Sequence, residues 1–555
     1  MEALLILSLV FAPLAFASVE PWALALLQLA AFSAAARLFL SRKPLYPAIP
    51  YKNLLPAILA IACLGLLQSV RENPVNAPSV FLFTVWRPAT LNAVLLWLFY
   101  AAVLFSVPQI IQTPGQFKRL IWPVFGMGVL ISLFGMFQKS GENDMIYGLR
   151  FVKGEPFGPF INRDHAALFL IMSAMAGLGV FVSGLRDLFS RQSRKRFFDL
   201  AAIQFLKAVM LCAVIYGVVR TGSRGGLHSL VCAFSLMAFI SASFVKSKGP
   251  RFAARAGVIV FLAGYGFLLY NNRLLLGFDN GNLVSSVTVR FSMYRSGFEM
   301  LRDFPLFGVG LGAVEHAFHA YKFQDIPAWG YVRHVHSDWL ELFLQTGFIG
   351  GLVYLAGFIA AMLGFFRIWL KCPSFTTKSL YGGALGAILA ASLHNLVEFG
   401  SQMPANALVL YVLIGALASK PAAESRKFRY DAEDENDEPP PLKKASAFYL
   451  AAASSLLIVF TIPSVIGWSC DFLAREASYE QKVKWHSAAL KWDPSPRYAF
   501  RLGADYYNRA LKNKSEARAL FTKSLAAIEP ALLRNPVNSD LIKLKKALQG
   551  LLCMI

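Results

Sequence analysis

The sequence predicts an all-α protein that crosses a membrane many times. Of its 555 residues, 56% are hydrophobic and 15% are charged, whereas soluble domains are about 25% charged. Apolar segments of about 17–25 residues, the length needed to span a bilayer, recur along the chain. A segment surrounded by lipid must satisfy its backbone hydrogen bonds internally, so we expect these segments to be helices.

We expect a polytopic bundle of about 12–13 transmembrane helices. The first segment resembles a signal peptide near Ala15–Ala17, but no Lys or Arg precedes Arg37. Because signal peptides begin with positive charge, we interpret the segment as an uncleaved spanning helix. The predicted spans are 2–18, 22–40, 53–68, 89–107, 120–138, 166–184, 201–219, 226–244, 256–271, 346–366, 381–397, 405–419 and 447–469.

Positive charges in alternate loops predict how the helices are oriented. A net charge of +22 in a soluble protein would suggest nucleic-acid binding. Here many Lys and Arg residues occupy short loops between spans, as the cytoplasmic loops of membrane proteins do. We therefore expect a cytoplasmic N-terminus and no nucleic-acid partner. The loops expected outside are 18–21, 69–88, 139–165, 220–225, 271–345 and 398–404.

The chain is expected to divide into a membrane domain and a small tail. Residues 1–419 form the membrane domain, with an extracytoplasmic loop at 272–345. The acidic, proline-containing stretch 420–446 is typical of a solvated linker, here in the cytoplasm. An additional span at 447–469 would then carry residues 470–555 to the outside.

The tail, residues 470–555, is predicted to be helical and amphipathic. Its alanine spacing and closing proline are similar to tetratricopeptide helix pairs, but only one to two repeats are visible. Such repeats need about three neighbours to be stable alone. We expect the tail to pack on the membrane domain, on another copy of the chain, or on a protein partner.

Arg220 and Arg224 lie in a glycine-rich turn between two predicted spans. Guanidinium groups bind phosphate oxygens bidentately, and glycines allow close approach of the backbone. An arginine deep in a bilayer costs about 2.5–3.5 kcal/mol on insertion scales, so it usually has a partner. Phosphate binding and simple snorkelling to the interface both remain open.

A third arginine lies on a helix predicted at 286–302, along the membrane surface. Arg290, Tyr294 and Gly297 share one face of this helix. Arg290 could form another phosphate contact, or it could pair with a nearby acid such as Asp303.

His334, His336 and Asp338 immediately precede the tenth predicted span. Histidine is the side chain best suited to accept a proton near neutral pH. The two histidines and the acid could also bind a metal, but spacing provides no third strong ligand. The acidic pair in 142–144 is a weak rival metal site, and six cysteines without C-x-x-C spacing add none. We predict that His336 is a general base, without metal or cofactor.

These segments, in this order, resemble the bacterial O-antigen ligase and polymerase superfamily of membrane glycosyltransferases. The resemblance covers about residues 1–420, and one difference is Ser337, where the family commonly has Asn beside the histidine. The matching segments are Pro13–Phe16 with Val19–Trp22, Gly158–Ala166, Ser223–Gly226, Arg290 with Pro305–Gly310, His336–Leu340 with Gly347–Gly350, and His394–Glu398 with Pro404–Asn406.

The resemblance implies a C-type glycosyltransferase-like fold in the bacterial inner membrane, with the active site and the tail on the periplasmic side. It implies inverting, metal-independent transfer of a glycan from an undecaprenyl diphosphate carrier to a hydroxyl of an acceptor glycolipid or glycan. Arg224 and Arg290 would hold the diphosphate and His336 would deprotonate the acceptor. We expect Arg220 to bind the diphosphate as well, and Asn162, Arg163, His334 and Asp338 to be supporting residues.

Other functions also fit the sequence. The superfamily includes polymerases, which extend a lipid-linked repeat unit, and transferases that glycosylate proteins. A lipid or polysaccharide transporter could line its path with the same arginines. A scaffold whose tail docks other enzymes is the third class.

Overall fold

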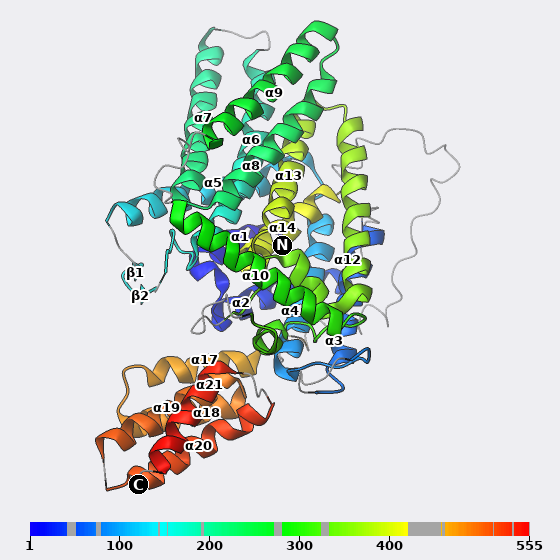
Figure 1. The fold of residues 1–555 in the computed structure, drawn as a ribbon. Helices are drawn as coiled ribbons and strands as arrows, with labels where there is room; N and C mark the ends of the chain where they lie inside the picture. The colour runs from blue at the N-terminus through cyan, green and yellow to red at the C-terminus, as the bar shows by residue number, and fades with distance from the viewer. Residues whose placement is uncertain are drawn as a thin grey trace.

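The computed structural model confirms an all-α chain (Figure 1). It describes residues 1–41, 51–73, 79–141, 145–152, 154–189, 194–270, 280–323, 332–419, 457, 461–513, 515–534 and 538–553. The linker 420–446, the acidic pair in 142–144 and most of the span predicted at 447–469 lie outside these residues.

The described helices follow the predicted spans closely. A two-residue hairpin, β1 (Met145–Ile146) and β2 (Arg150–Phe151), lies between α5 and α6. The helices of the membrane domain are α1 (Glu2–Leu14), η1 (Phe16–Ser18), α2 (Pro21–Leu40), α3 (Tyr51–Gln68), α4 (Arg87–Ile110), α5 (Pro114–Ser140), α6 (Arg163–Leu188), α7 (Arg194–Thr221), α8 (Arg224–Ser241), η2 (Ala242–Phe244), α9 (Lys248–Tyr270), α10 (Asn280–Asp303), α11 (Val314–Ala317), η3 (Phe318–Ala320), α12 (Asp338–Lys371), α13 (Phe375–His394), η4 (Gly400–Gln402) and α14 (Pro404–Leu417).

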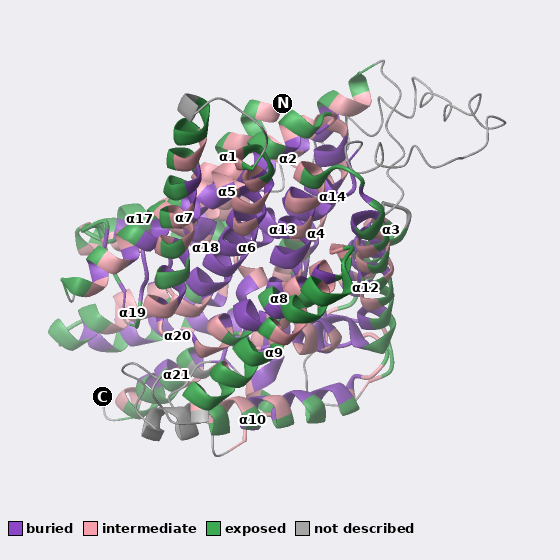
Figure 2. Ribbon diagram, turned by 90° about the horizontal axis from the view of Figure 1, so that it is seen from above, coloured by how far each residue is buried: buried purple, intermediate pink, exposed green. Residues whose placement is uncertain are grey.

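Eight helices in the described part of the chain are long and apolar enough to cross a membrane. Each coincides with a predicted span, so the chain is a polytopic membrane protein. The helices at 2–14, 53–68 and 404–417 are shorter apolar segments. α10, by contrast, lies across the bundle in both Figure 1 and Figure 2, as the sequence predicts for a surface helix.

α6 forms the centre of the bundle, and Figure 2 shows buried residues concentrated on α6, α13 and α14. Gly179 of α6 faces Gly383 of α13 so closely that a Cβ on Gly383 would lie 2.7 Å from the Gly179 Cα atom. Small residues allow such backbone contact between membrane helices. This contact fixes α13 against α6.

α12 is not one straight helix but a helical hairpin that turns at Gly347. Gly347 has φ +63°, and a Cβ there would lie 2.2 Å from the Leu306 carbonyl carbon. The short first arm then runs back along the second, because Trp339 and Phe358 have ring centroids only 5.3 Å apart. The predicted loop 272–345 therefore ends inside this hairpin, and its last residues are helical and packed against the bundle.

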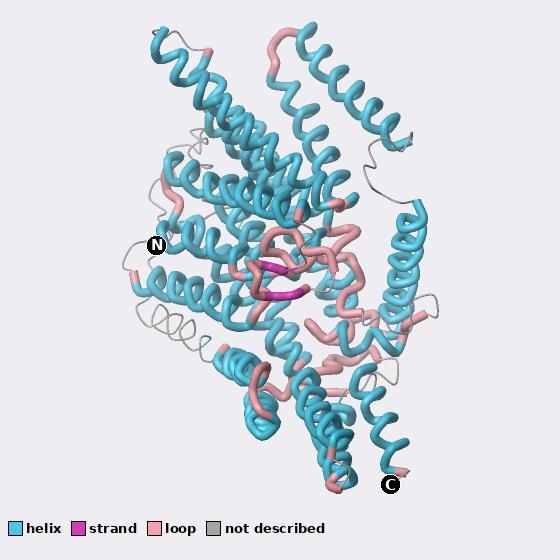
Figure 3. The backbone as a smooth tube through the Cα atoms, turned by 90° about the vertical axis from the view of Figure 1, so that its left-hand side faces the viewer, coloured by secondary structure: helices cyan, strands magenta, loops and turns pink. Residues whose placement is uncertain are grey.

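Figure 3 shows a cluster of loops around the two short strands, and hydrogen bonds join loops that carry the predicted site residues. Lys139 at the end of α5 donates to the Thr221 carbonyl at 3.4 Å. The Asp338 amide donates to the Asn395 carbonyl at 3.0 Å. The opposite end carries the Glu2–Arg119 ion pair, at 2.7 Å. Alternate loops thus lie at opposite ends.

The tail lies at the same end of the bundle as these loops (Figure 1). The Trp468 indole donates to the Glu20 carboxylate at 2.6 Å, and its ring centroid lies 6.3 Å from that of Trp22. The tail thus leans on the membrane domain. Its helices pack consecutively on one another and are α17 (Ile462–Ala474), α18 (Tyr479–Trp492), α19 (Pro496–Lys512), α20 (Ala517–Arg534) and α21 (Ser539–Leu552).

Candidate functional site

Glu398, which follows α13, connects His336 and Arg290. The Nδ1 atom of His336 lies 3.0 Å from one carboxylate oxygen of Glu398, and Arg290 on α10 forms an ion pair with the other. The Glu398 side chain is 2% exposed, whereas those of His336 and Arg290 are each 27% exposed. A buried carboxylate therefore holds the predicted base beside one predicted phosphate ligand, and both remain accessible.

The surroundings of Glu398 keep its carboxylate ionised. Burial by itself would raise its pKa, but the hydrogen bond and electrostatic interaction with His336, together with the positive charge of Arg290, lower the pKa to about 2. An ionised Glu398 accepts the proton on Nδ1 of His336, which leaves Nε2 as the nitrogen that can accept another proton. The carboxylate also stabilises the imidazolium that would result.

The backbone of His336 is held in an unusual conformation. Its φ of +52° lies in the left-handed region, which is uncommon for residues other than glycine. The Tyr294 hydroxyl donates to the His336 carbonyl at 2.9 Å, and the Phe399 ring packs edge-on at 4.9 Å. Backbone strain of this kind concentrates at functional sites. The neighbouring contacts fix the direction of the imidazole.

Arg224 begins α8 and contributes to a cluster of positive charge. Gly222 has φ +74°, and the Ser223 hydroxyl accepts from the Gly226 amide at 3.2 Å, so the turn ends in a capped helix. Arg224 lies within electrostatic range of Arg163 and Arg290. Arg220 lies within the same range of Lys139. The predicted arginines thus lie near one another, on the four helices α6, α7, α8 and α10.

His394 and Glu398 are buried next to this cluster, and neither was among the predicted site residues. His394 at the end of α13 is 0% exposed and lies within electrostatic range of Asp164 and Glu398. A Cβ on Gly225 would lie 3.7 Å from its ring, so a glycine there lets α8 approach α13. The sequence signal was present, because His394 and Glu398 belong to one of the matching segments.

Asn162, Arg163 and His334 have structural partners. The Asn162 side chain accepts from the Asp164 amide at 2.8 Å and caps α6, and Arg163 pairs with Glu155. His334 lies 2.7 Å from Glu341 through Nδ1 and stacks on Phe399 at 4.5 Å. Burial opposes protonation, but Glu341 raises the pKa of His334 overall.

Asp338 has hydrogen-bond partners other than His336, and Ser337 lies between the two in sequence. The Asp338 carboxylate accepts from the Ser401 amide at 2.8 Å and from Gln402 at 3.1 Å. The Ser337 hydroxyl accepts from the Leu340 amide at 3.3 Å and caps α12. Serine and asparagine are both good N-caps. The difference from the family at Ser337 is therefore compatible with the same local structure.

Arg290 does not pair with Asp303, the alternative that the sequence left open. Asp303 accepts instead from the Tyr321 hydroxyl at 2.8 Å, and Arg290 turns to Glu398. Among the described residues, no group of three or more His, Cys, Asp or Glu side chains is arranged to hold a metal ion. The weak rival site at 142–144 lies outside them.

Comparison with known proteins supports the resemblance over part of the chain. A family model described as O-antigen ligase matches residues 208–355, which include Arg220, Arg224, Arg290 and His336. No curated protein matches the chain.

One similar solved structure comes from work on structural coordination of polymerization and crosslinking by a peptidoglycan synthase complex. It is 13% identical, with a TM-score of 0.32, and the match covers 67% of this chain and 98% of the other. A similarity this low carries no argument about function. The family match over residues 208–355, together with the polytopic all-α fold, supports the similarity of this chain to the O-antigen ligase and polymerase superfamily of membrane proteins.

Proposed function

We propose that the protein is an O-antigen ligase-like glycosyltransferase. It would transfer a glycan from an undecaprenyl diphosphate carrier to a hydroxyl of an acceptor glycolipid or glycan, with inversion and without a metal. The observation that carries this proposal is the contact of Glu398 with both His336 and Arg290. That contact joins a base to a cation at the membrane end where the arginines gather.

In the proposed step, Nε2 of His336 accepts the proton of the acceptor hydroxyl. The hydroxyl oxygen forms a bond to the anomeric carbon while the bond from that carbon to the carrier phosphate breaks. The electron pair of the broken bond remains on the diphosphate, and the proton remains on His336 until it is released. General base catalysis of this kind contributes about 10²–10⁴-fold.

The cations stabilise the charge that develops on the departing diphosphate. Arg224 and Arg290 would bind its oxygens, and Arg220 would add positive charge nearby. Because a neutralised diphosphate is a good leaving group, the mechanism requires no separate general acid.

The carrier's polyprenyl chain would occupy a large apolar cavity. The cavity has a volume of about 480 Å³ and is lined by α6, α8, α12 and α13. Met237 of α8 contributes to the lining thirteen residues after Arg224, about 20 Å along the helix axis. A chain anchored by diphosphate at Arg224 can therefore reach this cavity along the same helix.

The proposal includes the orientation that the loop charges predict. The N-terminus would be cytoplasmic, and the site and tail would face the periplasm of a bacterium. The arginines at this end are unusual for an external face, and a phosphate ligand explains them. A protein partner on residues 470–555 remains part of the proposal. Deleting the tail would then abolish complex formation without abolishing transfer.

A transfer assay on the purified full-length protein tests the proposal. Undecaprenyl diphosphate carrying one glycan is offered with rough lipopolysaccharide, with further carrier as the acceptor, or with a protein acceptor. Ligase action predicts glycan on the lipopolysaccharide. Chain growth on the carrier alone would identify a polymerase, and glycosylated protein a protein transferase. Carrier transport without any transfer would identify a transporter.

A further inference from the structure

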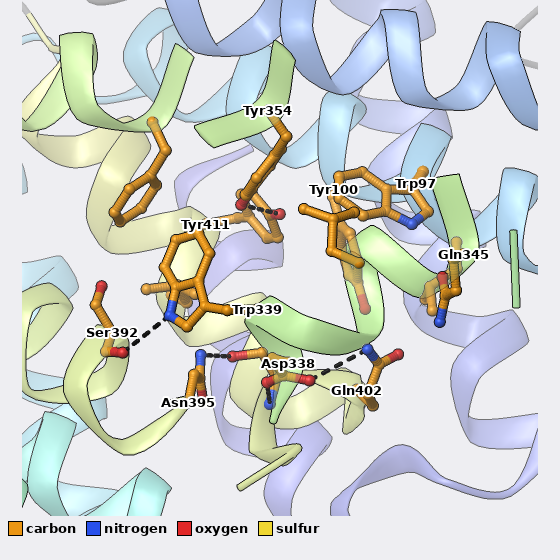
Figure 4. A pocket seen from close by; sticks show the side chains of 15 residues that line it. Trp97, Tyr100, Asp338, Trp339, Gln345, Tyr354, Ser392, Asn395, Gln402 and Tyr411 are labelled. Atoms are coloured by element: carbon orange, nitrogen blue, oxygen red, sulfur yellow. Dashed lines mark hydrogen bonds between the residues drawn. The ribbon is translucent and has the colours of Figure 1, made fainter. Parts of the chain in front are cut away.

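A second cavity lies beside Asp338 and Trp339, which follow His336 in the chain. It plays no part in the transfer step described above. Its volume is about 80 Å³, well above the ~10–15 Å³ that one water molecule needs. Its lining comes from α4, α12, α13, η4 and α14 (Figure 4). Six aromatic residues contribute: Trp97, Tyr100, Trp339, Tyr354, Phe358 and Tyr411.

Polar groups form the remainder of the lining. Asp338 faces the cavity with both oxygens already accepting hydrogen bonds from Ser401 and Gln402. The Trp339 indole donates to the Ser392 carbonyl at 3.1 Å, which fixes its ring (Figure 4). The cavity is thus a rigid combination of aromatic faces and hydrogen-bonding groups.

Two polar atoms of the lining residues have no hydrogen-bond partner within the described part of the chain. They are the Tyr100 hydroxyl and the side-chain oxygen of Asn395, and both residues are 5% exposed. Tyr100 is locked by stacking on Tyr411, with ring centroids 4.7 Å apart. Buried polar atoms are nearly always bonded to protein or to ordered water, so a polar ligand in this cavity would supply the partners that the protein does not.

The chemistry of the lining selects among possible ligands. A lipid chain would leave Tyr100 and Asn395 without hydrogen bonds, and the lining residues include no Lys or Arg to bind a phosphate. A sugar ring fits, because its hydroxyls donate and accept and its C–H edges are attracted to the negative faces of aromatic rings. We propose that this cavity binds a sugar ring of the acceptor glycolipid. The inference rests on the proposed function and adds the acceptor's position to it.

The cavity is connected to the reacting site through the backbone. Asp338 lies two residues after His336, and its amide donates to the Glu398 carbonyl at 3.1 Å. The cavity lining includes α4, α12 and α14, whereas the arginines lie on α6, α7, α8 and α10. The acceptor and the donor would therefore bind among different helices. The segment from His336 to Asp338 would contribute to both binding sites.

Binding of rough lipopolysaccharide to the full-length protein in detergent tests this assignment. Tyr100→Phe keeps the stacked ring and removes only the hydroxyl, so the Kd should rise about fivefold to tenfold, because 1.4 kcal/mol corresponds to tenfold. Binding of the undecaprenyl diphosphate glycan and of lipid A without core sugars should be unchanged. Tyr216→Phe, on the exposed side of α7, is the matched control and should change none of them.

An unchanged Kd for rough lipopolysaccharide in Tyr100→Phe would overturn the assignment and leave a cavity that holds only water. An equal loss of lipid A binding would overturn it too, because the cavity would then recognise lipid. Failure of the proposed function gives a different pattern. In that case the unmodified protein binds no undecaprenyl diphosphate glycan, whereas the effect of Tyr100→Phe on lipopolysaccharide still decides the assignment of the cavity.

Discussion

Glu398 lies 3.0 Å from Nδ1 of His336, although 62 residues separate the two in sequence. The pair resembles the acid–histidine arrangement in which a carboxylate selects the tautomer of a catalytic imidazole. The same carboxylate binds Arg290, so loss of its charge should affect both the base and the cation.

Glu398→Gln should preserve the shape of the site but remove this charge. We expect transfer to fall by at least about tenfold, because the imidazolium loses its stabilising partner. Carrier binding should change less, since Arg224 is untouched. Glu299→Gln, at a half-exposed position on α10, is the control. Full transfer by Glu398→Gln would show that the carboxylate is only structural.

The same variant should alter how stability depends on pH. The pKa of Glu398 in the folded protein is about 2, against an ordinary value of 4.5. Its folded pKa is depressed, so its contribution is present above pH 4.5 and is lost as the pH falls toward 2. The melting temperature in detergent should therefore fall with acidification over this window, and it should fall less in Glu398→Gln.

Arg224→Ala should weaken carrier binding, and Arg224→Lys should restore it only partly. Lysine keeps the charge but loses the planar fork that binds two phosphate oxygens. Titration with undecaprenyl diphosphate should show the highest affinity for the native protein, a lower affinity for Arg224→Lys and the lowest for Arg224→Ala. Arg186→Ala, at the opposite end of α6, should have no effect. Equal affinities in all four proteins would exclude Arg224 as a diphosphate ligand.

The apolar cavity should recognise the length of the carrier's lipid chain. Ala238 lines it, so Ala238→Trp would fill part of the space without touching the arginines. Affinity for undecaprenyl diphosphate should drop, whereas affinity for a short-chain prenyl diphosphate should not. If both affinities fell equally, the substitution would have acted through the fold.

Gly347→Ala should destabilise the helical hairpin that positions the His336 loop. The residue has φ +63°, and an added Cβ would lie 2.2 Å from backbone atoms of Leu306. We expect a lower melting temperature and a loss of transfer. Gly264→Ala, where a Cβ meets nothing within 4 Å, should be neutral. A native melting temperature in Gly347→Ala would contradict the hairpin.

The hydropathy of the sequence predicted the membrane-spanning helices well, because the apolar residues that make a helix suitable for crossing a membrane lie within that helix. The eight long helices all match predicted spans. The hairpin at Gly347 could not be predicted in this way. Its first arm is apolar on the face that packs on Phe358. Hydropathy therefore does not distinguish this arm from the membrane span that follows it.

The candidate site was predictable in its residue types but not in its contacts. Arginines in a glycine-rich turn and histidines before a span were visible locally. The partners of Arg290 and His336 depend on α10 and α13 meeting across the bundle, which no local spacing encodes. For that reason the sequence offered Asp303 for Arg290, whereas the fold provides Glu398.

The most direct measurement compares carrier binding and glycan transfer in His336→Ala. The protein should bind the undecaprenyl diphosphate glycan with native affinity, because Arg224 and Arg290 remain, but its transfer rate should fall about 10²–10⁴-fold. Raising the pH should not restore the rate. Native transfer by His336→Ala would contradict the account, as would a parallel loss of binding and transfer.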